Sequence, residues 1–238
     1  MTLKDKLAAQ KIYLFLAALF ITSLVVSNLI FQKFFYWYPF GADASTSIFG
    51  VKLFEISVGI LPYPITFLIT DLISEIYGKK RANQVVVAGI FASIFSLLII
   101  LVADNVPAIA NSPIQDDLFS QVFGNSVIAV FASMTAYLFA QFIDIQVYHF
   151  WKRVTKGKHL WLRNNFSTLF SQFVDTFSIV FLLCAFKIIP WESFKGLLIS
   201  GFLFKVFVAA LDTPLLYFGV YLFKKRFNLN TNEELDLL

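Results

Sequence analysis

The stretch TDLISEIYGKKR, from Thr70 to Arg81, sets two carboxylates one helical turn apart in an apolar run that ends at three cations. Asp71 and Glu75 are four residues apart, so a helix places them on the same face. An apolar helix that stops at a basic cluster is typical of a membrane span. Ionisable residues at membrane depth are rare and usually belong to a functional site. This stretch therefore predicts a membrane helix that carries part of a binding site.

The composition of the whole chain is that of a membrane protein. Of 238 residues, 58% are hydrophobic and 14% are charged, with a mean hydropathy of +0.75. Soluble domains have about 45–50% apolar and about 25% charged residues. Because one span needs roughly 20 residues, we predict an all-α integral membrane protein whose residues 1–238 form a single domain of six transmembrane helices. The expected spans are residues 12–35, 58–77, 83–103, 126–150, 166–188 and 194–223.

The cations are distributed unevenly between the predicted loops. Fourteen of the 19 Lys and Arg residues fall in the N-terminal flank, the turn at 79–81, the loop at 151–165 and the flank at 224–226. Since cytoplasmic loops are enriched in Lys and Arg, both termini are expected in the cytoplasm. We expect these clusters to contact the anionic headgroups of the lipid bilayer. No soluble module is present to offer a nucleic-acid surface.

The connections and helix faces carry weaker signals. After the first span, residues 47–54 are expected to form a short interfacial strand, and the polar tail from Asn228 is expected to fray. Ala132, Ala136 and Ala140 recur every four residues, a spacing that lets another helix approach closely. This alanine face fits packing inside the monomer and fits a homodimer equally well.

Five carboxylates lie inside predicted spans, where each costs about 2.5–3.5 kcal/mol at a helix centre. They are Asp71, Glu75, Asp144, Asp175 and Asp212. Lys205, the cation within the last span, cannot neutralise all five. It is seven residues from Asp212, roughly 10 Å along the helix, so we expect it to pair with an acid on another helix. The surplus of acid favours a polar cavity at membrane depth over an interhelical ion-pair network.

Two of these acids share a local pattern. Gln141 precedes Asp144 in QFID, and Gln172 precedes Asp175 in QFVD, so each amide projects from the same side of its helix as its acid. Antiparallel spans would let the two pairs face one another across a cavity, as in inverted repeats.

The chemistry of such a cavity leaves three ligands open. A carboxylate can accept two parallel N–H bonds, which suits the N1–H and 2-amino group of a guanine-like base, while a glutamine amide can donate to O6 or N7. A cationic amine suits the acid surplus equally well, and a proton is the third candidate. The sequence contains no phosphate-binding loop, nucleophile motif or metal-ligand spacing. We therefore predict a protein that is not an enzyme and has no cofactor or metal.

Four longer blocks cover most of the chain from residue 62 to residue 217. They are PYPITFLITDLISEIYGKKRA (62–82), AQFIDIQVY (140–148), LWLRNNFSTLFSQFVDT (160–176) and KVFVAALDTPLLY (205–217). In this order they resemble the signature of the queuosine precursor transporter family, also called vitamin uptake transporters. The resemblance implies a six-span inner-membrane carrier for 7-deazaguanines. These substrates are 7-cyano-7-deazaguanine, 7-aminomethyl-7-deazaguanine or queuine, salvaged for a modified tRNA base.

Carried over position by position, the resemblance assigns most of the same polar residues. The expected substrate contacts are Asp71, Glu75, Gln141, Asp144, Gln172, Asp175, Lys205 and Asp212. The expected supporting residues are Asn28, Thr70, Arg81, Arg163, Asn164 and Thr176. The alternative is the substrate-binding subunit of an ATP-driven vitamin importer of the energy-coupling factor type, which is also small, six-spanning and without an ATPase.

Overall fold

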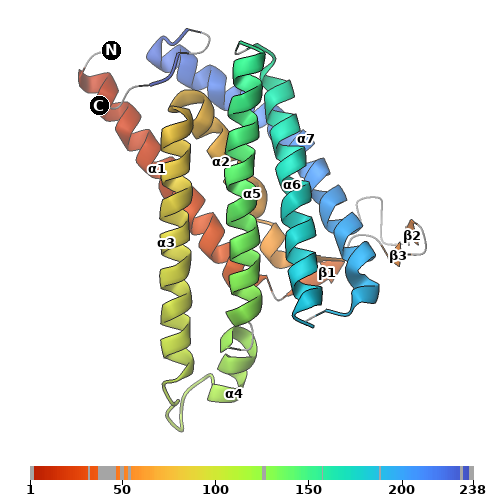
Figure 1. Ribbon diagram of the computed structural model, residues 1–238. Helices are drawn as coiled ribbons and strands as arrows, with labels where there is room; N and C mark the ends of the chain where they lie inside the picture. The colour runs from red at the N-terminus through yellow and green to blue at the C-terminus, as the bar shows by residue number, and fades with distance from the viewer. Residues whose placement is uncertain are drawn as a thin grey trace.

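A computed structural model describes residues 3–31, 33–36, 47–48, 51–52, 55–124, 127–156, 158–187, 189–230 and 233–235. Long helices dominate the structure (Figure 1). The helices are α1 (Leu3–Ile30), η1 (Val58–Ile60), α2 (Tyr63–Ile76), α3 (Gly78–Asp104), α4 (Asp116–Phe119), η2 (Ser120–Gly124), α5 (Val127–Val154), α6 (Leu160–Ala185), η3 (Trp191–Ser193) and α7 (Phe194–Phe227). The strands are β1 (Phe34–Tyr36), β2 (Ser47–Ile48), β3 (Val51–Lys52) and β4 (Glu55–Ser57).

Five helical segments in the described part of the chain are long and apolar enough to cross a membrane. They are α1, Val58–Ile76, α3, α6 and Trp191–Phe227. The 28-residue α5 packs between α3 and α6 and runs antiparallel to both (Figure 1). The helical membrane class is thus supported, and the count of six spans stays a prediction.

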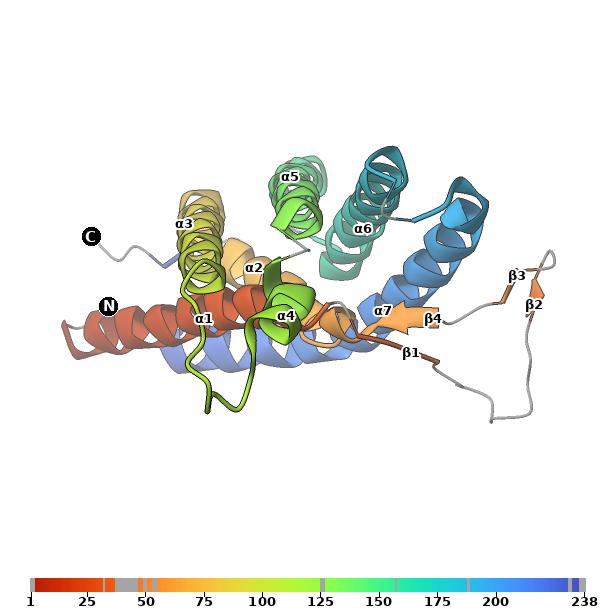
Figure 2. The ribbon, with the colours of Figure 1, turned by 90° about the horizontal axis from the view of Figure 1, so that it is seen from below.

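The helix α2 lies at the centre of the bundle. Seen from below in Figure 2, α3, α5 and α6 form one row, α1 and α7 lie on the other side, and α2 lies between them. In Val58–Ile76, 61% of the most apolar stretch is buried, against 22% in α1 and in α3. The polar side chains of α2 therefore face protein instead of lipid, as intramembrane ionisable groups require.

The start of α2 is fixed by prolines and by a close approach to α1. Pro62 caps the helix and Pro64 lies in its first turn, where a missing backbone donor is tolerated. A Cβ on Gly59 would lie 2.5 Å from the carbonyl oxygen of Ser27. The Ser27 hydroxyl also donates to the Gly59 carbonyl, so the backbones of α1 and η1 are in direct contact.

Several helices extend beyond the predicted spans. α3 begins at Gly78, so the three cations expected in a turn belong to its first helical turn. α6 begins at Leu160, and α5 and α7 continue to Val154 and Phe227. Hydropathy marks only the part of a helix inside the hydrocarbon, whereas Lys and Arg are good helix formers outside it.

Two small antiparallel pairs of strands interrupt the helical pattern. In β1 and β4, Phe35 lies opposite Ile56, and in β2 and β3, Ser47 lies opposite Lys52. The predicted strand at 47–54 coincides with β2 and β3, and residues 49–50 and 53–54 lie outside the described part.

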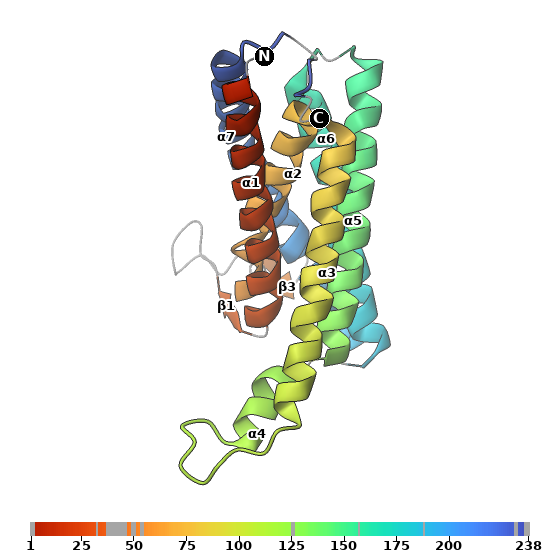
Figure 3. The same cartoon turned by 90° about the vertical axis from the view of Figure 1, so that its left-hand side faces the viewer.

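The basic segments gather at one end of the bundle. In Figures 1 and 3, α1 begins, α2 meets α3, α5 meets α6 and α7 ends at the same end, opposite α4. Asp5 and Arg226 form an ion pair at 3.1 Å between α1 and α7 at this end. These are the connections that hold the cation clusters. The arrangement agrees with the charge asymmetry, and the cytoplasmic assignment of this end stays a prediction.

The alanine face of α5 packs inside the monomer where it is described. Ala136 is 4% exposed and Ala140 is 0% exposed, and α5 contacts both α3 and α6. The side chain of Ala132 lies outside the described residues. Small side chains here serve close helix packing, and the homodimer stays a prediction.

The tail is docked at residues 233–235, so the prediction that it frays is wrong there. Leu235 is 5% exposed, and its backbone N–H donates to the carbonyl oxygen of Ile76 at 2.7 Å. The Glu234 carboxylate accepts a hydrogen bond from Lys152 Nζ at 2.8 Å. One buried leucine and one ion pair, which overall polarity does not reveal, hold the segment against the end of α2.

Replacing Gly78 with alanine should destabilise the protein by about 1–3 kcal/mol. Gly78 has a φ of +81°, which L-residues adopt only with strain, and an added Cβ would collide with the Glu234 carboxylate. Thermal unfolding in detergent measures the effect. Gly219→Ala is the matched control, since its Cβ would meet only a methyl end of Leu72 at 3.3 Å. Equal melting temperatures for the two variants would contradict the prediction.

Candidate functional site

Polar side chains fill the space between α2, α5, α6 and α7. Every one of these helices contributes groups that are at most 8% exposed. We call these residues the polar cluster. They are Thr70, Asp71, Gln141, Asp144, Asn164, Thr168, Ser171, Gln172, Asp175 and Lys205. Buried polar groups need hydrogen-bond partners from protein, water or ligand, so the partners of each group show what the site still lacks.

Asp175 lies at the contact of α2, α6 and α7 and is 0% exposed. Its Oδ2 accepts a hydrogen bond from the Tyr63 hydroxyl at 2.7 Å and pairs with Lys205 Nζ. Lys205 Nζ also lies 4.6 Å from the centre of the Tyr63 ring, a cation–π contact. Lys205 therefore pairs with an acid on another helix, as expected.

Asp71 of α2 and Asp144 of α5 bring two more acids together. Their carboxyl groups lie within hydrogen-bonding reach of each other. Asp144 Oδ1 also accepts from the Ser171 hydroxyl at 2.8 Å, and Asp71 Oδ2 accepts from Thr168 at 3.4 Å. Two buried acids in contact are stable only when they share a proton or meet a cation. In the described part of the chain, no third His, Cys, Asp or Glu joins such a pair to form a metal-binding group.

The two glutamines of the QFID and QFVD segments have different surroundings. Gln141 Oε1 accepts from Thr70 at 3.2 Å, and its Nε2 donates to the Tyr137 hydroxyl at 2.6 Å. Gln172 Oε1 has no hydrogen-bond donor in the part of the chain that the structure describes. Their helices α5 and α6 are antiparallel neighbours, but Gln141 faces α2 and Gln172 lines a cavity against α7. Of the two pairs, only Gln172 belongs to the wall of this cavity, and the inverted repeat stays a prediction.

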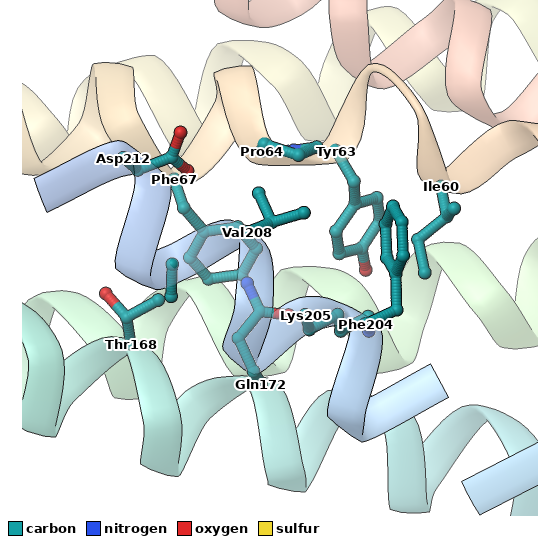
Figure 4. A pocket seen from close by; sticks show the side chains of 11 residues that line it. Ile60, Tyr63, Pro64, Phe67, Thr168, Gln172, Phe204, Lys205, Val208 and Asp212 are labelled. Atoms are coloured by element: carbon teal, nitrogen blue, oxygen red, sulfur yellow. The ribbon is translucent and has the colours of Figure 1, made fainter. Parts of the chain in front are cut away.

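That cavity lies between α2, α6 and α7 (Figure 4). Its walls are formed by Ile60, Tyr63, Pro64, Phe67, Thr168, Gln172, Phe204, Lys205, Val208, Ala209 and Asp212. The free space is about 10 Å³, enough for about one water molecule. The cavity thus has no room for a larger ligand, which requires the helices to separate.

Three buried acceptor atoms in the cluster have no hydrogen-bond donor among the described residues. They are Asp144 Oδ2, Gln172 Oε1 and Asp175 Oδ1. An unsatisfied buried acceptor costs about 1–3 kcal/mol. The site is therefore short of donors and has acceptors to offer to a ligand.

Glu75 is one turn beyond Asp71 but belongs to a separate ionic cluster near the end of α2. Its Oε2 accepts from the Tyr148 hydroxyl at 3.1 Å and lies 3.7 Å from Lys152 Nζ. Its Oε1 lies 3.6 Å from Lys224 Nζ. Glu75 is not part of the cavity wall. The structure therefore places this predicted substrate contact in a network that joins α2, α5 and α7.

The predicted supporting residues are divided between the site and other places. Asn164 and Thr176 are buried on α6, at 3% and 5% exposed. Asn28 borders a second small void beside α1 and α3, and Arg81, which is half-buried in the first turn of α3, donates a hydrogen bond to Gln84. The side chain of Arg163 lies outside the described residues.

Tyr63 and Thr168 are among the residues of the site that were not predicted. Thr168 is one turn before Gln172 on α6, so helical periodicity could have identified it. Tyr63 stands between two prolines at a helix start, a position that carries no signal of a site. Its contact with Asp175 arises only because α2 packs against α6.

Comparison with known proteins gives two matches. Residues 57–219 match the family described as "Putative vitamin uptake transporter". A protein of Bacillus subtilis (strain 168), described as "Probable queuosine precursor transporter", is 31% identical over 171 residues, which cover 70% of this chain and 73% of the relative. No solved structure matches the chain. The matched region contains α2, α5, α6 and most of α7, and so the whole polar cluster.

Proposed function

The chain belongs to the vitamin uptake transporter family, and from this premise we propose that it imports a queuosine precursor across the inner (plasma) membrane. Both matches are described as transporters and neither as an enzyme. The proposed substrate is a 7-deazaguanine, such as 7-cyano-7-deazaguanine, its aminomethyl relative or queuine. The proposed site is the polar cluster with its adjoining cavity, and the end that gathers the cations is the cytoplasmic end.

The observation that carries this proposal is the shortage of donors in the site. Among the described residues, Gln172 and Asp175 each have an acceptor oxygen without a donor, and Asp144 has one that a proton shared with Asp71 would satisfy. A guanine-like base presents several N–H donors along one edge, and carboxylates accept such donors with strong, charge-assisted bonds. The rings of Tyr63 and Phe204 in the cavity wall (Figure 4) supply flat apolar surface for a planar base.

Transport requires the closed cavity to open to each side of the membrane in turn. Pro214 lies inside α7, two residues after Asp212. A proline removes one backbone hydrogen bond and kinks a helix. We place the moving element here: α7 bends at Pro214 and withdraws from α2, which widens the cavity between them.

Uptake of a labelled base tests the proposal. Cells that lack both the synthesis of 7-cyano-7-deazaguanine and their own importer should take up the labelled compound when they express this chain. Absence of uptake, with the protein present in the membrane, would reject the function. Uptake by the purified protein alone in liposomes would exclude the alternative of a subunit that depends on an ATPase partner.

Replacing Gln172 with alanine should lower the initial rate of uptake about 10- to 100-fold, since a hydrogen bond inside the site is worth about 1–3 kcal/mol. Gln146→Ala is the matched control, because Gln146 is an exposed glutamine of α5 that accepts a hydrogen bond from Lys79. Immunoblots of the membrane fraction check that both variants accumulate. Equal uptake by the two variants would remove Gln172 from the site.

A further inference from the structure

Asp212 occupies one end of the cavity. Figure 4 shows its carboxyl group beside Pro64 and Phe67, while Tyr63 and Phe204 lie at the other end and the amide of Gln172 lies between. Lys205 and Asp212 are seven residues apart on α7, which separates them by about 10 Å along the helix axis. The cavity wall therefore has a charged side chain near each end.

The two charges differ in their pairing. Lys205 is paired with Asp175, which lies behind the cavity wall. Asp212 is partly buried and has no hydrogen-bond or ion-pair partner among the described residues. Lys205 and Asp212 are the only Lys, Arg, Asp or Glu residues in the wall of this cavity. When its carboxyl group is ionised, Asp212 therefore supplies the uncompensated charge of the cavity. Asp71, another acid, interacts with it electrostatically.

An unpaired carboxylate next to an apolar wall attracts a cation strongly, because few dipoles screen the charge there. A protonated amine satisfies it with charge-assisted hydrogen bonds. A neutral substituent leaves it without a partner, and burial of an unpaired charge is unfavourable. Asp212 thus distinguishes a substrate with an amine arm from one that lacks it.

We propose that Asp212 is a specificity residue that binds the protonated amine on the side arm of the substrate, while the planar base lies toward Gln172 and Tyr63. This inference rests on the proposed function and deepens it. It predicts that the carrier prefers a 7-deazaguanine with an aminomethyl arm over the otherwise similar base with a neutral cyano group.

Competition between the two bases tests the inference. Cells that lack their own importer and express the unchanged chain should take up both bases. The half-saturation concentration for 7-aminomethyl-7-deazaguanine should be at least tenfold lower than that for 7-cyano-7-deazaguanine. Asp212→Asn keeps the shape and removes the charge, and it should reduce this ratio at least tenfold. Asp212→Glu keeps the charge and should retain the preference for the amine. Asp117→Asn, at an exposed acid of α4, is the matched control and should leave the ratio unchanged.

The outcomes separate the two claims. If Asp212→Asn leaves the ratio of the two half-saturation concentrations unchanged, the specificity role is overturned and the transport function still stands. This holds whether uptake of both bases falls equally or uptake of neither changes. A wild-type preference for the cyano compound overturns it as well. If the wild-type protein takes up neither base, the proposed function itself fails, and the inference fails with it.

Discussion

Lys205→Met should abolish uptake and destabilise the protein by about 3–5 kcal/mol, the usual penalty for removing one partner of a buried ion pair. The Lys205 side chain is 8% exposed and that of Asp175 is 0% exposed. Without the ammonium group, Asp175 would keep the Tyr63 hydroxyl as its donor and would hold an uncompensated charge at the contact of three helices. Thermal unfolding in detergent and uptake of the labelled base measure the two effects.

A second variant separates stability from function. Buried ion pairs replaced on both sides by apolar residues often give proteins of equal stability. Lys205→Met combined with Asp175→Leu should therefore recover most of the lost stability and remain inactive. Lys195→Met, at an exposed lysine near the start of α7, should change neither property. A normal melting temperature for Lys205→Met, or uptake by the double variant, would contradict the assignment.

Glu75→Gln should destabilise the protein by about 3 kcal/mol, near the lower end of the range for a broken buried pair. The amide preserves the shape of the side chain but leaves Lys152 and Lys224 without this carboxylate. Lys152 retains Glu234 as a partner at 2.8 Å, which limits the loss. The melting temperature and the amount of protein in the membrane are the measurements.

The same variant decides between two roles for Glu75. If Glu75 holds α2, α5 and α7 together, the fraction of the Glu75→Gln variant that folds should bind the substrate with nearly unchanged affinity. If it contacts the substrate, stability should be normal and uptake should be lost. Glu192→Gln is the matched control, since Glu192 is exposed in η3. We expect the first result because Glu75 is not part of the cavity wall.

The sequence by itself indicated the membrane-spanning segments and their polar residues. Hydropathy located the long helices because transfer of apolar side chains into lipid is a property of each segment alone. The cost of a charge in lipid likewise singled out Asp71, Asp144, Asp175 and Lys205 before any contact was known. The same reasoning did not find the ends of the helices, because α3 and α6 continue into basic residues that lie outside the hydrocarbon.

Only the tertiary structure decided which polar residues work together. Asp71 and Glu75 look equivalent in sequence, yet one meets Asp144 and the other meets two lysines. Tyr63 reaches Asp175 although 112 residues separate them. The partners of a buried charge depend on how helices rotate and pack against each other, and this depends on shape contacts spread over the whole bundle. Periodicity along one helix fixes the direction of a side chain but not what it meets there.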